Sequence, residues 1–412
     1  MPSQVLSAIV VIWICTAGAN AEQALDVMDE RTLIKAIEAG DPRVELIAAE
    51  VDAAAAEVLA ARRRPDPRIA VDREEVFPAG GGLATSYVRV VVPLDISGRR
   101  GRMIAAATAN LGAARAESDV QRFVLVVDAL RVFREAEYLR LRVGSMTADR
   151  GALARAVDIV AKRARAGEAA GYDQQRLELE LAAYDDLIAS AAIDLRVAQQ
   201  RLASLVGRPG QRVDAAGALA PVTTPVPALE TLLGDPLAQR GDYRAAKLRL
   251  DAAAADRAAA DRAWVPSLEL TAGAMSSDLG TGSASGYVAG LSFSLPIFDR
   301  GAAGRARADA ARRTAAADAR LLEREITSAI RIAYETWTER AAQVARFESA
   351  QLAPLEQLLR SAETAYRDGG GSIVELLDAY RTAREARLRN LELRRETSLA
   401  VLDLWRALGT RP

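Results

Sequence analysis

The sequence contains no histidine and only one cysteine, Cys15. Without histidine the chain lacks the commonest metal ligand and the commonest general base, and one cysteine cannot form an intrachain disulfide. No glycine-rich phosphate loop and no nucleophile with a neighbouring base is recognisable in the 412 residues. We therefore predict that the protein is not an enzyme, that it has no catalytic or metal-binding residues, and that it needs no cofactor.

Aromatic residues are also scarce, at 5% of the chain, whereas alanine and arginine are abundant. Such a composition is typical of long helices rather than of compact mixed domains. The net charge of −1 gives no electrostatic basis for a nucleic-acid partner.

The first 21 residues carry no charged side chain and end in Ala19-Asn20-Ala21, the small-x-small form of a signal-peptidase site. We predict a signal peptide over residues 1–21 and an exported mature chain. An uncleaved membrane anchor is one alternative, although the apolar run is shorter than the ~20 residues of a spanning helix. A lipoprotein anchored at Cys15 is another, disfavoured by Trp13 and Ile14. No later stretch is apolar enough for a spanning helix, so strands would have to cross any membrane.

A strand that leads into a very long helix occurs twice in the sequence. In residues 290–301, apolar and serine residues alternate with the period of a strand, Pro296 ends the strand, and Gly301 permits the turn into a helix. Residues 90–98 repeat this pattern with Pro93 and Gly98. We assign Pro93, Gly98, Pro296, Asp299 and Gly301 to two strand-to-helix junctions, where Asp299 could pair locally with Arg300.

Corresponding breakpoints recur at a nearly constant offset along the chain. Pro65 and Pro266 are 201 positions apart, and Gly98 and Gly301 are 203 positions apart. We predict a tandem duplication with repeats over residues 22–207 and 228–412, joined by a linker at 208–227. In each repeat we expect helix, strand, loop, strand, long helix, tight turn and helix. The expected helices cover 25–64 (with a turn or N-cap signal at Asp41-Pro42), 98–165, 173–205, 229–262, a long helix that follows Gly301 and Gly304, runs to about 366 and is kinked at Pro354, and 373–408. The expected strands cover 68–77, 87–94, 268–274 and 287–295.

Two separate hairpins cannot form a stable sheet alone, because their edges would stay unpaired. A closed barrel removes the edges, and four strands per chain can close only when several chains contribute.

If such a barrel lies in a membrane, the charges in residues 68–77 are unusual for a lipid-facing strand. Tyr87 and Tyr287 follow the two outer loops and are either aromatics at the membrane interface or solvent-exposed strand residues.

These features resemble the outer-membrane efflux (TolC-like) family over essentially the whole mature chain. The matching segments are Trp264-Val-Pro-Ser-Leu268, Leu295-Pro-Ile-Phe-Asp-Arg-Gly301, Tyr366-Arg-Asp-Gly369, Leu377-Asp-Ala-Tyr-Arg381 and Ala407-Leu-Gly409. Residues 93–102 are most similar to the CzcC-like branch, which serves heavy-metal efflux pumps.

The resemblance implies a mainly α fold with a small β part. Long antiparallel helices would form a periplasmic α-barrel, and three chains would form a twelve-stranded β-barrel in the outer membrane of a Gram-negative bacterium. The implied partners are two further copies of the chain, outer-membrane lipid, a periplasmic adaptor protein and an inner-membrane transporter of the RND type. Residues 208–227 would belong to a belt around the tunnel.

The resemblance also places the two glycine-rich reversals at the periplasmic tips, where Arg165, Gly167, Arg367 and Gly369 are candidate adaptor contacts. Ordinary helix capping is the alternative interpretation of these residues. Just beyond the tips, Asp173, Glu375 and Asp378 could form a ring of carboxylates that narrows the tunnel and holds cations. The alternative is that they only complement the helix dipole.

The function implied is that of a passive exit duct in a tripartite efflux system, with heavy-metal cations as one cargo. A duct for drug efflux or type I secretion is an alternative within the same family. A soluble periplasmic coiled-coil scaffold or adaptor is the alternative from another class.

Overall fold

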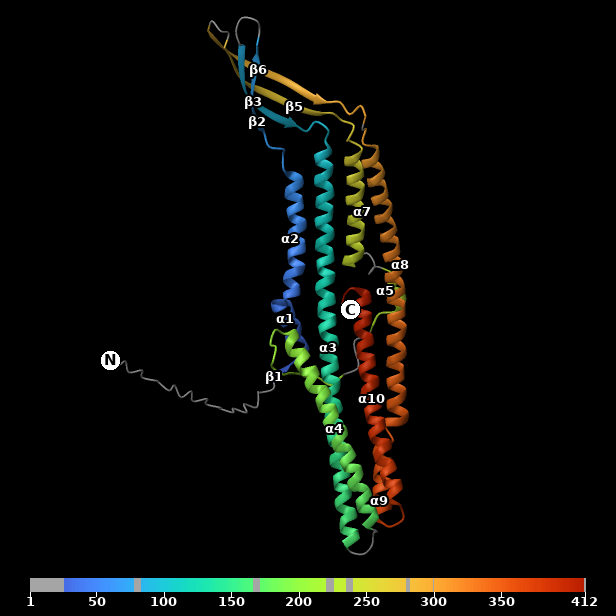
Figure 1. The fold of residues 1–412 in the computed structure, drawn as a ribbon. Helices are drawn as coiled ribbons and strands as arrows, with labels where there is room; N and C mark the ends of the chain where they lie inside the picture. The colour runs from blue at the N-terminus through green and yellow to red at the C-terminus, as the bar shows by residue number, and fades with distance from the viewer. Residues whose placement is uncertain are drawn as a thin grey trace, which may run out of the picture.

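The protein is described by a computed structural model over residues 26–77, 83–165, 171–219, 226–234, 240–278, 282–298 and 300–410. The molecule is elongated: a sheet lies at one end, long helices run away from it, and two helix reversals lie at the other end (Figure 1). We call these the sheet end and the reversal end. The predicted signal peptide, residues 1–21, lies outside the described residues.

The long helices run roughly parallel or antiparallel to the long axis (Figure 1). Helix α3 has 67 residues, which corresponds to about 100 Å. The helices are α1 (Glu30–Gly40), α2 (Pro42–Arg62), α3 (Arg99–Arg165), α4 (Gly171–Leu205), α5 (Leu229–Leu233), α7 (Gly241–Ala260), α8 (Ala302–Phe347), α9 (Leu355–Arg367) and α10 (Ile373–Leu408). The mainly α fold predicted from the sequence is confirmed.

One antiparallel sheet contains the four long strands in the order β2-β3-β5-β6. Their bounds are β2 (Arg68–Val76), β3 (Leu83–Leu94), β5 (Ser267–Asp278) and β6 (Ser283–Ser294). The prediction of two separate hairpins is wrong, because β3 pairs with β5, with Val88 opposite Ala274. The two hairpins thus share one sheet, and β2 and β6 form its edges.

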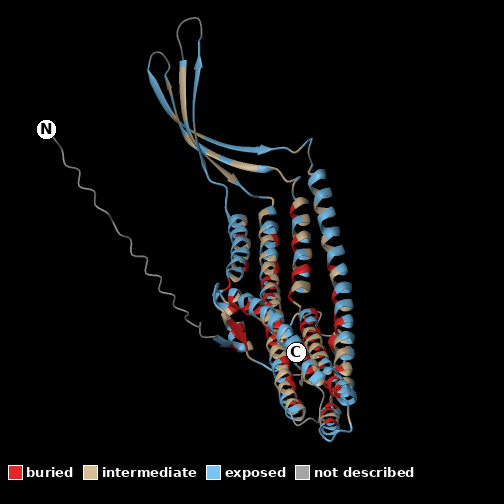
Figure 2. Cartoon of the chain, turned by 60° about the horizontal axis from the view of Figure 1, so that its bottom comes forward, coloured by how far each residue is buried: buried red, intermediate tan, exposed pale blue. Residues whose placement is uncertain are grey.

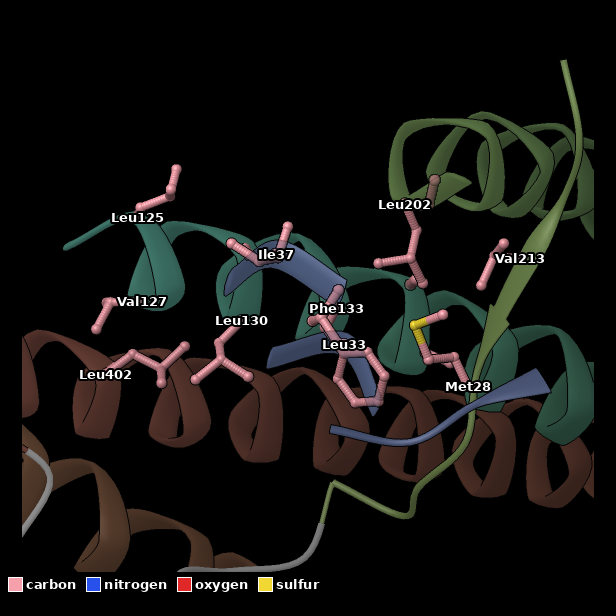
Figure 3. Packing of buried hydrophobic residues seen from close by; sticks show 14 of the residues in the cluster. Met28, Leu33, Ile37, Leu125, Val127, Leu130, Phe133, Leu202, Val213 and Leu402 are labelled. Carbon is pink, nitrogen blue, oxygen red and sulfur yellow. The ribbon is translucent and has the colours of Figure 1, made fainter. Parts of the chain in front are cut away.

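A second, parallel pair joins β1 (Asp26–Met28) to β4 (Val213–Ala215). Here the sequence predictions, helix from residue 25 and no regular structure over 208–227, are wrong. Met28, Val213 and Ala215 are buried against Phe133 and Leu202 in the largest apolar cluster, so packing against distant helices forms these short strands (Figure 3).

Three of the predicted helices are divided. The helix expected over 25–64 is divided into α1 and α2 at Asp41, which is the N-cap of α2. The region expected as one helix over 229–262 contains α5, which ends at Leu233, and α7, which begins at Gly241. The helix in which the sequence predicts a kink at Pro354 is divided near this residue: a π-helical turn over Glu348–Leu352 follows α8, and Pro354 is the N-cap of α9.

Burial is concentrated along the lines where helices meet, and much of the outer surface of the helices is exposed (Figure 2). No residue of the four long strands falls in the buried class. A second buried cluster lies near the reversal end, where α3, α4, α9 and α10 pack around Leu153, Tyr184 and Tyr380. Within the described residues, the helices pack closely near the reversal end, whereas the side chains of the sheet are left uncovered.

Candidate functional site

The sheet has one continuous apolar face, which we call the apolar face. The register places Val71, Val88, Ala274 and Tyr287 in one row across the four strands. The neighbouring rows on this face are also apolar. They contain Ile69, Val90, Val92, Leu94, Leu268, Leu270, Ala272, Ala289, Leu291 and Phe293. Leu291 is 66% exposed and Ile69 is 75% exposed. An apolar surface that crosses four strands and stays uncovered indicates contact with an apolar medium or partner.

The opposite face of the sheet is polar and is held together by side-chain bonds. Arg68 Nη2 donates to Glu269 Oε1 at 2.7 Å, and Arg89 pairs with Asp72. The hydroxyls of Thr85 and Ser277 lie 2.9 Å apart. We call this the polar face, and its groups suit contact with water.

This division explains the charges that are unusual for a lipid-facing strand in residues 68–77. Arg68 and Asp72 project from the polar face, where each has an ionic partner. Arg73 lies on the apolar side in a row with Ser86, Ser276 and Ser285, beyond the apolar rows, and its Nε lies 2.6 Å from Glu75 Oε1. The apolar face therefore ends in a polar border next to the strand tips.

The two tyrosines that looked equivalent in the sequence lie on opposite faces. Tyr287 is 95% exposed on the apolar face, next to the polar border. Tyr87 lies on the polar face, and the Arg89 guanidinium is 5.6 Å from the centroid of its ring. The two tyrosines therefore differ in the face of the sheet that they occupy, and only Tyr287 lies on the apolar face.

The predicted strand-to-helix junctions lie where the strands leave the sheet. Gly98 and Gly301 have φ values of +67° and +77°, which favour glycine, directly before α3 and α8. A Cβ atom on Gly301 would lie 2.7 Å from that of Ala263. Pro93 stays within β3, opposite Glu269, whereas Pro296 follows the end of β6. Asp299 lies outside the described residues.

At the reversal end, the structure places the predicted tip residues close to the two turns. Arg165 ends α3 and is exposed, and its Nε donates to the carbonyl of Ala161 at 3.2 Å. Arg367 ends α9 and is exposed, and Gly369 follows with φ of +80°. Gly167 lies outside the described residues.

The three predicted gate carboxylates have different surroundings. The Tyr366 hydroxyl donates to Asp173 Oδ2 at 3.1 Å, which joins the second reversal to the first. Glu375 belongs to a capping box: its Oε2 accepts from the Ser372 backbone N–H at 2.8 Å, and its own N–H donates to Ser372 Oγ at 3.2 Å. Asp378 is exposed one turn further along α10. Glu375 thus has a structural role at the start of α10.

A buried ionic group near the reversal end was missed at the sequence level. Glu180 of α4 is 8% exposed and accepts from Arg381 Nε at 3.0 Å. The Arg381 hydrogen bonds are the main cause that lowers the pKa of the Glu180 carboxyl below its ordinary value. The Arg384 guanidinium lies 4.9 Å from the centroid of the fully buried Tyr184 ring, and burial raises the pKa of that tyrosine.

A signal for this group exists in the sequence. Glu180 and Arg381 are 201 positions apart, and so are Arg68 and Glu269, the pair on the polar face. This separation matches the offset between the two predicted repeats. Opposite charges at corresponding positions of the two halves therefore predict ion pairs between them.

Two further observations concern the described part of the chain. None of its helices is both long and apolar enough to cross a lipid bilayer. Among the same residues, no group of three or more Asp, Glu, His and Cys side chains is arranged to hold a metal ion.

Comparison with known proteins identifies relatives over most of the chain. Residues 232–410 match the profile of the family described as outer membrane efflux protein. The chain is 25% identical to the cobalt-zinc-cadmium resistance protein CzcC of Cupriavidus metallidurans over 367 residues, which are 88% of this chain and 85% of CzcC. It is 24% identical over 390 residues to nodulation protein T of Rhizobium leguminosarum bv. viciae, covering 88% of this chain and 78% of that protein.

Among solved structures, CusC superposes with a TM-score of 0.77 at 20% sequence identity, covering 93% of this chain and 92% of CusC. CusC is described as undergoing conformational changes that accompany folding and transmembrane channel formation. The likeness extends the shared fold to both halves of the chain, beyond the part that the family profile matches.

Proposed function

We propose that this chain is a member of the outer membrane efflux protein family, whose profile its residues 232–410 match, and that three copies of it form a passive exit duct of a tripartite efflux system. The sheet would lie in the outer membrane, with the apolar face toward lipid and the polar face toward the channel. The helices would continue the channel through the periplasm. The apolar face is the single observation that carries this proposal, because a soluble scaffold would leave those side chains in water.

The strand count supports assembly from several copies. Four strands with free edges at β2 and β6 cannot close on themselves, whereas three copies would supply twelve strands to one barrel. Each edge would then pair with the opposite edge of a neighbouring copy, and no edge would stay open to aggregation.

The reversal end would receive a periplasmic adaptor protein, itself seated on an inner-membrane transporter of the RND type. Support comes from the exposed Arg165 and Arg367, whose guanidinium groups can donate to backbone carbonyls of a partner. Gly167 and Gly369 would allow the partner's backbone to approach closely. Asp173 and Asp378 from three copies would narrow the channel and favour cations.

For the cargo we propose heavy-metal cations. The name of CzcC states resistance to cobalt, zinc and cadmium, and a second relative, 28% identical over 285 residues, is the nickel-cobalt-cadmium resistance protein NccC of Alcaligenes xylosoxydans xylosoxydans. Nodulation protein T is a relative of similar identity whose name states no metal, so a duct for drug efflux or type I secretion is the second candidate.

The test is the mass of the detergent-extracted protein together with its conductance in planar bilayers. We expect a trimer from the outer-membrane fraction with a small, cation-biased conductance, and a weaker bias in Asp173→Asn. A soluble monomer or dimer without conductance would overturn the duct. A trimer that conducts without cation preference would retain the duct and reject the carboxylate ring.

A further inference from the structure

The two edge strands of the sheet are connected to α2 and α8, which are the outermost helices next to the sheet. Strand β2 follows α2 through the short connection 63–67, and β6 leads into α8 through 295–301. Near the sheet, α2 packs on α3, α3 on α7, and α7 on α8, so α2 and α8 are the outermost helices (Figure 1). If β6 of one copy meets β2 of the next, α8 must lie beside α2 of that copy.

Helix α8 carries a row of arginines on its free side, which we call the arginine row. It consists of Arg313, Arg320, Arg324 and Arg331, at spacings of 7, 4 and 7 residues. All four are exposed, and none forms an ion pair within the described part of the chain. By contrast, Arg340 further along α8 pairs with Glu396 at 2.6 Å. A hollow lined by three of these arginines, Glu323, Thr327 and Ser328 runs along the row.

Helix α2 carries carboxylates on its free side, which we call the acidic row. Glu45 and Asp52 are seven residues apart and exposed, and neither has an ionic partner among the described residues. Ile47 and Val58 form the buried side of α2 toward α3. At 100° per residue, the acidic row is turned by roughly 140° from that buried side.

The arginine row is turned by a similar angle from Ile326 and Ile330, the buried side of α8. Helix α2 runs toward the sheet and α8 runs away from it, so they would be antiparallel neighbours (Figure 1). The two helices lie at opposite edges of the layer α2-α3-α7-α8 and run in opposite directions. Similar rotations in the same sense from their buried sides therefore bring both rows to the same face of this layer.

The two rows also lie at matching distances from the sheet. At a rise of about 1.5 Å per residue, Asp52 lies about 15 Å from Arg62, the sheet-side end of α2, and Arg313 lies about 17 Å from Ala302, the sheet-side end of α8. By the same measure Glu45 lies about 26 Å and Arg320 about 27 Å from those ends.

We propose that these rows form an electrostatic seam between copies of this chain, with Arg313 against Asp52 and Arg320 against Glu45 of the neighbouring copy. This inference rests on the proposed oligomeric duct and specifies which surfaces meet and in which vertical register. Each exposed pair contributes little to affinity, but opposite charges at fixed levels disfavour vertical slippage between smooth, alanine-rich helices.

A cysteine pair tests the register directly. In a Cys15→Ser background, the variant Asp52→Cys/Arg313→Cys treated with a short bifunctional maleimide in outer membranes should give covalent dimers and trimers on denaturing gels. The matched control is Asp52→Cys/Arg331→Cys, because Arg331 lies in the same row about 27 Å further from the sheet. Cross-linking of the control as efficiently as the test pair, or of neither, would overturn the seam.

Charge reversal provides a second test that separates this inference from the duct itself. Arg313→Glu/Arg320→Glu should increase dissociation of the detergent-extracted trimer about tenfold, and adding Glu45→Arg/Asp52→Arg should restore it. Arg312→Glu is the control for a charge reversal outside the row: Arg312 is exposed and is turned by about 100° from the row toward the side of Ile330, so this substitution should leave the trimer unchanged. A wild-type protein that is not a trimer contradicts the duct. A wild-type trimer that is insensitive to both reversals contradicts the seam alone.

Discussion

The Glu180 carboxylate lies under the side chains of Arg381 and Arg384, between the two helical hairpins of the reversal end. Its pKa is lowered in the folded protein, so it contributes stability that is present above its ordinary pKa of 4.5 and is lost as the pH falls through the lower folded-state value. Glu180→Gln should lower the free energy of unfolding at pH 7 by about 2 kcal/mol, because Arg381 and the mostly covered Arg384 lose the buried carboxylate that they share.

The measurement is the melting temperature of the detergent-solubilised protein as a function of pH. The difference between wild type and Glu180→Gln should be constant near pH 7 and shrink below pH 4.5. The control is Asp185→Asn. Asp185 lies in α4 like Glu180, and its exposed ion pair with Arg150 of α3 is lost in this variant, which should change the melting temperature little. Equal effects of the two substitutions would contradict the assignment.

At the scale of the element, adjacent residues of β6 project from opposite faces of the sheet. Leu291 lies on the apolar face opposite Leu270, and Ser292 lies on the polar face opposite Glu269. Leu291→Arg should destabilise the membrane-inserted protein by about 2–4 kcal/mol if this face meets lipid. Ser292→Arg should be tolerated, since the new guanidinium would lie near a carboxylate.

The fraction of protein that inserts into lipid vesicles, measured by protease protection and heat-modifiable gel mobility, checks this difference. Because the two substitutions introduce the same side chain at neighbouring positions, general loss of foldability cannot mimic it. Equal insertion of both variants would mean that the apolar face does not contact lipid.

The start of α10 depends on its capping box. Ser372→Ala should weaken the first turn by about 1 kcal/mol, because the backbone N–H of Glu375 loses its acceptor. Hydrogen exchange of the amides in residues 373–376 should become about fivefold faster, while Thr314→Ala, in an exposed part of α8, should change no exchange rate near the turn. Unchanged exchange in residues 373–376 would show that the turn is held by packing of Ile373 and Leu376 instead.

The elements that the sequence predicted well are those fixed by local chemistry. Helix α10 has the predicted bounds, and α3 begins within one residue of prediction. Local residues set these boundaries: Ser372 caps the start of α10, Gly409 ends it, and Gly98 precedes α3. Strands β1 and β4 have three residues each and no alternation, so only burial of Met28 and Val213 against distant helices reveals them. The β3–β5 pairing joins segments far apart in the sequence, and local patterns carry no information about it.

At the scale of the whole molecule, the predicted duplication stays a prediction, but it has a physical consequence. If the two halves lie side by side, corresponding positions lie at the same level, as the pairs Arg68–Glu269 and Glu180–Arg381 do. The candidate site was predicted only in part, because some of its contacts depend on how distant segments pack. The tip arginines and glycines could be found from turn chemistry, whereas the Tyr366–Asp173 bond depends on how two hairpins pack together.

A duct for metal cations should pass its cargo without holding it. We predict that the purified protein binds Co²⁺, Zn²⁺ or Cd²⁺ only weakly, because ordinary surface carboxylates lack the imidazole and thiolate ligands that bind such ions tightly. Isothermal titration calorimetry checks affinity, and the metal content of cells with and without the protein checks export. Submicromolar affinity would contradict a passive duct, and unchanged cellular metal would favour a different cargo.

Helix α3 extends from the sheet end to the reversal end without interruption, whereas its neighbours are divided along the same path into α1, α2 and α4, into α7 and α10, and into α8, the π-helical turn and α9. Each copy therefore contains one continuous helix beside several that are interrupted. In the proposed duct, α3 would set the distance between the outer membrane and the adaptor, so an opening motion at the reversal end would not shorten the molecule. Such a motion would have to bend α3 sideways while the jointed helices rotate at their breaks, which would make the stiffness of this single helix the mechanical limit on how far the duct can open.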